Sequence, residues 1–575
     1  MNSTAPLSSN PSSGGRNDRN NRIFSRREIE GLIADGRYII ILDGMVLQLD
    51  AWIPFHPGGS KSIEHMVGRD ATDEINALHS AEARQRMNSF RIGRIDGRWM
   101  NFLPPIQGGS FRPYDKDDVE PLHMSEVGDE ASSSGQDSSD PPSPIFQPVE
   151  GTARRRGPAS SVSSVTSKDS TGSTTDSKPC SRPHFLDART RQELLLDLAK
   201  YPSLDAKTQD FIIKKYRALH EQVKAEGLYN CDYFAYLIES LRYTLLGGLA
   251  LYFLRQGWYA TSAAFLGALW HQLVFTVHDA GHLGITHHFH VDTVIGILIA
   301  DYIGGLSIGW WKRNHNVHHI VTNSPENDPD IEHLPFFAIS HRFFDSLRST
   351  YYDRIMAYDI VSKFFIRYQH FLYYPILTFG RFNLYRLSWE YLLSGQAPRK
   401  GPAWWHRWFE LAGHLVFWAW FGYGVLYRSI PDWPNRILFI LISHAVTMPL
   451  HVQITLSHFA MSTADLGVNE SFAQKMLRTT MDVDCPQWLD FFHGGLQFQA
   501  IHHLFPRMPR HNLRKAQKLV MQFCKEVEVP YAIFTFLDGN KEVIGRLGEV
   551  AGQAKLLAEC QRSIIAEQGL HTHVH

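Results

Sequence analysis

The sequence of 575 residues lacks several features that would mark other classes of protein. Its five cysteines are scattered and form no CxxC pair, which argues against a disulfide framework and a thiolate metal site. The formal net charge is −1, so no bulk attraction to nucleic acid is expected. The N-terminal stretch MNSTAPLSSNPSSGG contains no apolar segment like that of a cleavable signal peptide. We therefore expect the N-terminal part of the chain to stay in the cytosol.

Long apolar runs begin only after residue 240, and four of them form two closely spaced pairs. The first pair is 243–254 with 258–277, and the second is 411–427 with 437–459. A membrane-spanning helix needs about 20 residues, and polar flanks extend the shorter runs toward that length. The pairs therefore predict two helical hairpins in a lipid bilayer. Buried helices of a large soluble protein would explain each run singly, but they explain two such pairs poorly.

A fifth apolar run, 293–311, contains Asp301. A carboxylate at the centre of a bilayer is costly, so we expect an interfacial or re-entrant segment that does not cross. Aromatic residues mix with arginine and lysine across 338–410, a composition typical of helices that lie in the headgroup region.

Serine dominates the stretch between the two halves of the chain, with sixteen serines between Ser125 and Ser181. Large apolar residues are almost absent there, so the stretch cannot bury enough surface to offset the entropy lost on ordering. We expect a disordered linker at 104–185 between a compact domain at 22–103 and a second domain at 186–575. A linker of ~80 residues would have an end-to-end spread of roughly 50 Å, which allows reversible docking of the first domain.

The motif WIPFHPGG at 52–59 projects His56 from a tight turn, and His79 follows in NALHS. Two imidazoles would fill both axial positions of a haem iron, which favours electron transfer over O₂ binding. HPGG alone would be only a turn with a histidine in it. Together with His79 and the strand-like RYIIILDGMVLQLD, however, it resembles cytochrome b5 over most of 22–100. The resemblance implies an α+β domain that binds haem b through His56 and His79.

Histidine is unusually frequent, with 30 residues, and three clusters have spacings that share one face of a helix. The clusters are HDAGH with His278 and His282, HNVHH with His315, His318 and His319, and QAIHH with Gln499, His502 and His503. Imidazole suits iron and zinc, and several such faces together can hold two metal ions. A lone histidine on an apolar helix is usually a hydrogen-bonded core residue, but three matched clusters are not explained in that way. For the histidines outside this spacing we expect local hydrogen bonding: His287, His288, His290 and His493.

These clusters and the stretch NSPENDPDIEHLPF resemble the membrane-bound fatty-acyl desaturases over about 230–510. The resemblance implies that the clusters bind two non-haem iron ions that activate O₂, and that His458 supplies a further ligand. Glutamine at the head of the third cluster, joined to a cytochrome b5 domain, is typical of the front-end branch of that family. Gln499 would then be a weak metal ligand or would hold a metal-bound water.

The segment around QAIHH and the Ser-rich insertion are similar to those of the fungal Δ8 sphingolipid desaturases. The resemblance implies an oxidoreductase that introduces a C=C bond at Δ8 of the long-chain base of a ceramide or other sphingolipid. O₂ is the co-substrate, and an NAD(P)H-dependent cytochrome b5 reductase would supply electrons through the haem. The alternatives are a Δ5 or Δ6 fatty acyl desaturase and a lipid hydroxylase with a similar di-iron centre. A non-catalytic haem-binding membrane protein would leave the three clusters unexplained.

The expected fold is an N-terminal α+β haem domain, a disordered linker and an all-α integral membrane domain. The last would have about four transmembrane helices, a cytosolic histidine-rich cap and C-terminal helices. If the haem domain is cytosolic, each hairpin leaves the cytosol and returns, so all three clusters share one side only when 293–311 does not cross. The expected location is the endoplasmic reticulum membrane, with multiple spans and no nucleic-acid partner.

Overall fold

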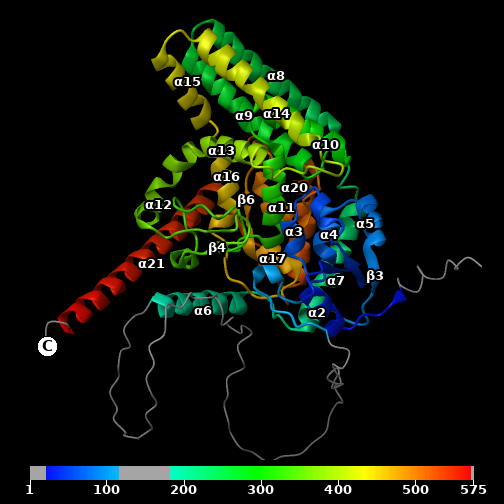
Figure 1. Ribbon diagram of the computed structural model, residues 1–575. Helices are drawn as coiled ribbons and strands as arrows, with labels where there is room; N and C mark the ends of the chain where they lie inside the picture. The colour runs from blue at the N-terminus through cyan, green and yellow to red at the C-terminus, as the bar shows by residue number, and fades with distance from the viewer. Residues whose placement is uncertain (1–20, 115–181, 572–575) are drawn as a thin grey trace, which may run out of the picture.

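The structure, a computed structural model, describes residues 21–114 and 182–571 (Figure 1). These residues form an N-terminal α+β domain and a larger helical domain, which confirms the fold class expected from the sequence. The linker predicted at 104–185 lies mostly outside the described residues, so its disorder and its boundaries stay predictions.

The N-terminal domain is built on a three-stranded antiparallel sheet in the order β1-β2-β3. Branched side chains favour the extended conformation in β1, and Asp43 and Gly44, both with positive φ, turn the chain tightly into β2. Every residue of β1 is buried, because its side chains alternate between two apolar clusters on the two faces of the sheet. The elements are α2 (Arg26–Ala34), β1 (Ile39–Leu42), β2 (Met45–Gln48), η1 (Ile53–Phe55), α3 (Lys61–Glu64), α4 (Thr72–Leu78), α5 (Ala81–Met87), η2 (Asn88–Phe90), β3 (Arg91–Arg94) and η3 (Pro105–Gln107).

Three helical segments of the described chain are long and apolar enough to cross a membrane. They are α8 (Tyr233–Arg255), α9 (Tyr259–Gly281) and the consecutive helices α15 (Trp433–Ala445) and α16 (Met448–Phe459). Only 11% of the apolar window of α8 is buried, which suits a helix that faces lipid. The predicted run 411–427 is divided between α14 (His406–Phe417) and the π-helix η6 (Trp418–Ser429), each of 12 residues. In Figure 1, α8, α9, α14 and α15 project from the rest of the domain as one bundle.

The run 293–311 is sharply broken, as its acidic residue suggested. The helix formed by α10 (Phe289–Ile297) and the π-helical η4 (Leu298–Ile303) meets α11 (Ile308–Val321) at an angle of 119°. Asp301 lies at the break and is fully buried, with its Oδ1 3.2 Å from Nδ1 of His414 and its Oδ2 accepting from the backbone N–H of Ile308. The bend is that of a broken span or a re-entrant loop, and non-crossing stays a prediction.

The start of α11 is held by a second buried carboxylate, Glu410 of α14. Its Oε2 accepts from the Ser307 hydroxyl at 2.5 Å and from the backbone N–H of Gly309 at 3.1 Å. A carboxylate at a helix N-terminus satisfies amides that have no partner within the helix and faces the positive end of the helix dipole. Glu410 therefore joins the bend before α11 to the membrane bundle.

We expect Glu410→Ala to destabilise the protein by about 1–3 kcal/mol, because it leaves these buried donors without an acceptor. Thermal unfolding followed by size-exclusion in detergent would measure the loss. The matched control is Glu390→Ala on α13 (Gly380–Leu393), where a half-exposed ion pair with Arg386 contributes about 0–1 kcal/mol. Equal unfolding midpoints for the two variants would contradict the role given to Glu410.

The remaining helices cover the base of the membrane bundle (Figure 1). Two of them, α12 (Ile360–Thr378) and α13 (Gly380–Leu393), expose large apolar side chains such as Ile360 and Phe371, consistent with the interfacial helices predicted at 338–410. The others are α6 (Arg182–Lys200), α7 (Ala206–Ala225), η5 (His341–Asp345), α17 (Phe472–Thr479), η7 (Gln487–Leu489), α18 (Asp490–His493), η8 (Leu496–Phe498), α19 (Gln499–Leu504), α20 (Arg510–Glu526) and α21 (Phe536–His571). Two short sheets join them, antiparallel β4 (Arg348–Ser349) with β5 (Arg354–Ile355) and parallel β6 (Asp482–Asp484) with β7 (Ile533–Thr535).

The α+β domain is docked on the helical domain, with α3 beside α11 (Figure 1). Apolar residues of the two domains form one cluster, in which Ile63 and Met66 pack with Val317 and Ile320. Polar contacts surround it, including Arg217 Nε to Asp73 Oδ1 at 2.7 Å and Lys61 Nζ to Asp353 Oδ2 at 3.1 Å. Burial of apolar side chains from both domains stabilises this interface.

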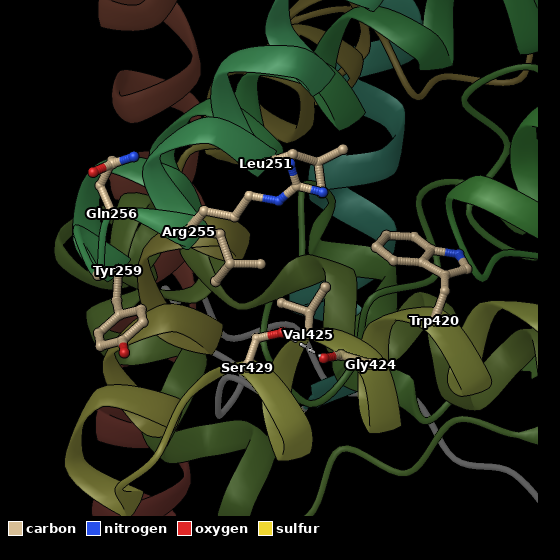
Figure 2. Close-up of a pocket in the computed structure, with 10 residues that line it drawn as sticks. Leu251, Arg255, Gln256, Tyr259, Trp420, Gly424, Val425 and Ser429 are labelled. Atoms are coloured by element: carbon tan, nitrogen blue, oxygen red, sulfur yellow. Dashed lines mark hydrogen bonds between the residues drawn. The ribbon is translucent and has the colours of Figure 1, made fainter.

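A groove of about 660 Å³ opens at the other end of the membrane bundle (Figure 2). Arg255, Gln256 and Tyr259, from the turn between α8 and α9, line one side, and Trp420, Val425 and Ser429 of η6 line the other. His278 and His282 lie at the opposite end of α9 from the groove. At 1.5 Å per residue of an α-helix, that end is about 28 Å away. The groove is therefore separate from the histidine clusters.

Candidate metal centre and haem site

The three histidine clusters come together in space although they are far apart in the sequence. HDAGH ends α9, HNVHH lies on α11, QAIHH forms most of α19, and His458 stands near the end of α16. The ligand-capable atoms of His278, His282, His315 and His502 all lie within 4.8 Å of one another. Those of His318, His458 and His503 form a second group within the same limit. Two groups of nitrogen donors are thus arranged side by side.

His319 lies between the two groups. Its Nε2 is 3.2 Å from Nε2 of His315, and its ring centroid is 4.3 Å from that of His503 and 4.8 Å from that of His282. The sequence predicted that all these histidines converge, and the structure brings them together.

Five buried imidazole nitrogens of these clusters have no hydrogen-bond partner among the described residues. They are Nε2 of His282, His502 and His503, and Nδ1 of His319 and His458. A buried polar atom without a hydrogen-bond partner is costly. Five such nitrogens in one place therefore indicate a ligand that they bind. Burial and the neighbouring imidazoles lower the pKa of His282, His502 and His503 well below the ordinary value. The rings are therefore neutral, the form that binds a metal, and the donor set fits iron.

Two aspartates that the sequence reasoning did not single out orient the histidines of α11. His318 Nδ1 lies 2.8 Å from Oδ2 of Asp328, and His315 Nδ1 lies 3.1 Å from Oδ2 of Asp330. A carboxylate behind an imidazole fixes its tautomer, leaves Nε2 free for a metal and increases its basicity. The signal was present in NSPENDPDIEHLPF, which places acidic residues just after HNVHH.

Asn323 links this loop to the remaining ligand. Its backbone N–H donates to Oδ2 of Asp328 at 2.7 Å, and its side-chain amide donates to the carbonyl of His458 at 2.8 Å. Asn323 has φ of 58°, a left-handed conformation that asparagine tolerates better than most residues. The residue therefore holds α11 and α16 in register beside the metal centre.

The first cluster is supported from the side of α20. Asp279, next to His278, receives hydrogen bonds from Arg510 and from the Tyr236 hydroxyl, and Arg510 also contacts Glu239 of α8. All four groups are partly or fully buried, so a single arginine joins α8, α9 and α20. This network fixes the end of α9 that carries His278 and His282.

Gln499 is buried at the first position of α19, three and four residues before His502 and His503. That spacing places its side chain on the same face as theirs. Its role as a metal ligand or as a group that holds a metal-bound water stays a prediction.

We expect Gln499→Ala to reduce turnover by about 10–100-fold while the protein remains folded, because an outer or weak ligand is lost and not an apolar contact. Product formation per haem-loaded protein, with non-haem iron measured on the same sample, would test this. Gln517→Ala on α20 is the matched control, since its amide contacts the Tyr531 hydroxyl. Turnover of Gln499→Ala close to that of the control would remove Gln499 from the site.

The other histidines have local roles where the structure shows a partner. The ring nitrogens of His287 lie 2.7 Å from the Leu283 carbonyl and 2.8 Å from the Tyr229 carbonyl, and His290 lies 3.3 Å from His406. His493 is buried and packs against Phe536. His287 and His290 thus make the local contacts expected of them.

The second site lies in the α+β domain, where His56 and His79 face each other. Their ring centroids are 6.1 Å apart, with 36° between the ring planes. An iron with one imidazole nitrogen about 2 Å away on each side would separate the centroids by about 6 Å. Nδ1 of His56 lies 2.8 Å from the Gly59 carbonyl and Nδ1 of His79 lies 3.3 Å from the Ile75 carbonyl, so each Nε2 is left for the metal. Burial lowers the pKa of His79 to about 3 and lowers that of His56 as well, which keeps both rings neutral.

Comparisons with known proteins agree with both sites. Residues 25–96 match the family described as "Cytochrome b5-like Heme/Steroid binding domain", and residues 256–535 match "Fatty acid desaturase". The "Delta 8-(E)-sphingolipid desaturase" of Emericella nidulans is 67% identical over 554 residues, which cover 96% of this chain and 98% of that protein. The chain belongs to the fatty acid desaturase family.

Two further relatives show how far the similarity extends. The "Delta 8-(E)-sphingolipid desaturase" of Kluyveromyces lactis is 50% identical over 562 residues, which cover 96% of this chain and 97% of that protein. The "Delta(8)-fatty-acid desaturase" of Helianthus annuus is 40% identical over 316 residues, which cover 54% of this chain and 67% of that protein. The enzyme is thus an oxidoreductase of the membrane, with a haem domain and an iron-binding desaturase domain in one chain.

Proposed function

We propose that the enzyme introduces a C=C bond at the Δ8 position of the long-chain base of a ceramide or other sphingolipid, with O₂ as co-substrate. The assignment of the substrate rests on the 67% identity, along almost the whole of both chains, to a protein named as a Delta 8-(E)-sphingolipid desaturase. The names of these relatives also favour the E geometry of the new bond.

Two non-haem iron ions would be held by the eight histidines and by Gln499. The first set is His278, His282, His315 and His502, and the second is His318, His319, His458 and His503, with Gln499 beside them. Iron bound there supplies the O₂-dependent chemistry needed to remove hydrogen from an unactivated methylene pair, which no side chain can do as a base. Asp328 and Asp330 orient the imidazoles, and the buried position of the histidines excludes water from the reacting groups.

Haem b would be held by His56 and His79. A haem bound by these two residues would supply electron transfer and not O₂ binding. The helix α11 packs against the α+β domain and carries three of the clustered histidines, which supports electron delivery from the haem domain to the metal centre within one chain. An NAD(P)H-dependent cytochrome b5 reductase would reduce the haem, and the location would be the endoplasmic reticulum membrane with both sites on the cytosolic side.

The convergence of the clusters supports this topology. The chain leaves the metal centre at His282 and returns to it at His315, so both ends of the bent segment lie on the same side. A crossing at 293–311 would separate His315 from His282. Glycosylation sites inserted after residue 324 should remain unmodified, and modification there would contradict the re-entrant topology.

The competing function is fatty acyl desaturation, which the name of the Helianthus annuus relative favours. Mass spectrometry of both lipid classes from a host that lacks Δ8-unsaturated bases, with and without this chain, separates the two. We expect new Δ8-unsaturated long-chain bases and unchanged fatty acids. Altered polyunsaturated fatty acids with unchanged bases would overturn the proposal, and hydroxylated products would indicate a hydroxylase.

A further inference from the structure

The eight clustered histidines are not equally accessible. His278 and His315, both in the first group of nitrogen donors, expose 17% and 12% of their side-chain surface, and their ring centroids are 5.7 Å apart. The remaining six are buried: His282, His318, His319, His458, His502 and His503. Reacting atoms must come within about 3–3.5 Å of each other. A substrate chain can therefore approach the centre most directly on the side of His278 and His315.

The indole of Trp311 lies on this accessible side. It stacks on His315, with ring centroids 4.5 Å apart and 26° between the planes. Its centroid is also 5.4 Å from those of both His278 and His282. Trp311 precedes His315 by one turn of α11, so the two side chains share a face of that helix. Trp311 is only half-buried, which leaves part of the indole open to a neighbouring molecule.

Apolar side chains continue from Trp311 into the bend between η4 and α11. Trp311 packs against a buried cluster of Ile297, Ala300 and Ile308. Val277 of α9 is partly buried and packs against the same cluster. Walls of this kind suit an alkyl chain, because they offer it contact area and almost no polar group. The accessible side of the metal centre is thus bordered by apolar surface.

The position of the indole depends on the absence of a side chain at Gly281, the last residue of α9. A methyl group on Gly281 would lie 2.2 Å from Cζ3 of Trp311 and 3.0 Å from its Cε3. Carbon atoms pack at about 3.5–4.0 Å, so no side chain fits between the helix and the ring. Glycine at this position lets the indole lie directly against the helix that carries His278 and His282.

We propose that Trp311 is a positioning residue, whose indole forms one wall of the site for the alkyl chain and sets which pair of methylene carbons faces the metal centre. This rests on the proposed function, in which that pair begins at carbon 8 of the long-chain base. Adjacent carbons of the chain are about 1.5 Å apart, so a displacement of that size would present the next pair. The wall formed by the indole therefore determines the position of the double bond.

The test locates the double bond in the products of the full-length enzyme. Trp311→Leu keeps an apolar side chain but removes the flat ring. One methylene in a fitted apolar pocket is worth about 10–200-fold, so we expect the ratio of Δ8 product to Δ7 and Δ9 products to fall by about tenfold or more. Non-haem iron should be retained, because no histidine is changed. Mass spectrometry after oxidative cleavage of the double bond measures the ratio.

The neighbouring tryptophan provides the matched control. Trp310 lies on the same helix but packs against Tyr391, Leu392 and Ala397 and not against the histidines. Trp310→Leu removes the same ring and should leave the position of the double bond unchanged. Product positions in Trp311→Leu that match those in Trp310→Leu would overturn the proposal.

Gly281→Ala tests the same indole from the other side. Its methyl group would force the ring to move, so the product positions should change although Trp311 is retained. Non-haem iron should also fall, because His282 is the next residue. Combining Gly281→Ala with Trp311→Leu removes the clash, and we expect the iron content to recover. Equal iron content in the single and double variants would contradict the contact between Gly281 and the indole.

Two photoreactive lipids test the contact without turnover and separate it from the assignment of the substrate. One is a ceramide with a diazirine at carbon 8 of its base, and the other is a phosphatidylcholine with a diazirine at carbon 8 of an acyl chain. We expect the ceramide probe to label α11 at or beside Trp311. Labelling of α11 by the acyl probe alone would support the role of Trp311 and refute the sphingolipid substrate. Labelling of other elements by both probes would overturn the role of Trp311.

Discussion

Replacement of His318 by alanine is expected to abolish desaturation and to lower non-haem iron sharply, with the haem spectrum unchanged. His318 is fully buried, belongs to the second group of nitrogen donors and has Asp328 behind it. Loss of the imidazole would remove one metal ligand and would also leave the buried carboxylate of Asp328 without its partner. The two effects together would weaken metal binding and stability more than either effect alone. Metal analysis of the purified protein, together with product formation, would measure both changes.

The variant Asp328→Asn isolates the orienting role of the carboxylate. It keeps the ligand but weakens the hydrogen bond that fixes the imidazole, so we expect a loss of about 10–100-fold in activity or metal affinity. His184→Ala, at an exposed position of α6, is the control for removal of a histidine. Normal iron content and turnover in His318→Ala would exclude His318 from the metal centre.

Replacement of His56 by alanine is expected to eliminate the haem spectrum and, with it, desaturation by the full-length enzyme. Without this axial ligand the iron is held from one side only, and an opened position would also change the chemistry from electron transfer toward ligand binding. Non-haem iron should be retained, because none of the metal-binding histidines of the desaturase domain is changed. Absorption spectra before and after reduction, with metal analysis and product formation, would test the three expectations together.

The third histidine of the domain supplies a matched control. His65 is also buried, but its ring nitrogens lie 3.0 Å from the amide of Gln107 and 3.5 Å from the hydroxyl of Thr350. His65→Ala should therefore keep its haem, at some cost in stability. Full activity of His56→Ala without added cytochrome would contradict an obligatory internal electron donor.

The histidine clusters and the facing pair of His56 and His79 could be predicted because both depend on short-range spacing. Residues at i, i+3 and i+4 share a helix face whatever surrounds the helix, so His315, His318 and His319 form a ligand set from sequence alone. The HPGG turn and a later histidine were likewise sufficient to indicate a haem pair, and the 6.1 Å ring separation agrees with it.

The supporting residues could not be predicted in the same way, because their partners are far away in the chain. Arg510 meets Asp279 across more than 200 residues, and Asn323 meets His458 across more than 100. Nothing in the local pattern of either segment identifies its partner. Asp328 and Asp330 are the exception, since acidic residues shortly after a histidine cluster are a local signal that was available.

The surface on which the haem domain docks could not be predicted from the sequence. The length of the serine-rich linker predicted reversible docking, and the structure shows the domain docked through a cluster of apolar residues from both domains, while its reversibility stays a prediction. Val317 and Ile320 alternate with metal-binding histidines on α11, so their apolar character was hidden within the histidine motif. The span predicted at 411–427 is not one continuous α-helix in the structure, because the helix changes to π geometry at Trp418.

The order of the ligands along the chain has a consequence for biosynthesis. Both proposed haem ligands lie within the first 79 residues, whereas the proposed metal centre is incomplete until His503 has been made. At about 5–20 residues per second, a ribosome needs on the order of 20–80 s to add the intervening part of the chain. The haem domain can therefore fold and acquire its cofactor while the membrane helices are still being inserted. Iron, in contrast, can be captured only after release of nearly the whole polypeptide, so a shortage of iron during synthesis would yield a haem-loaded but inactive enzyme.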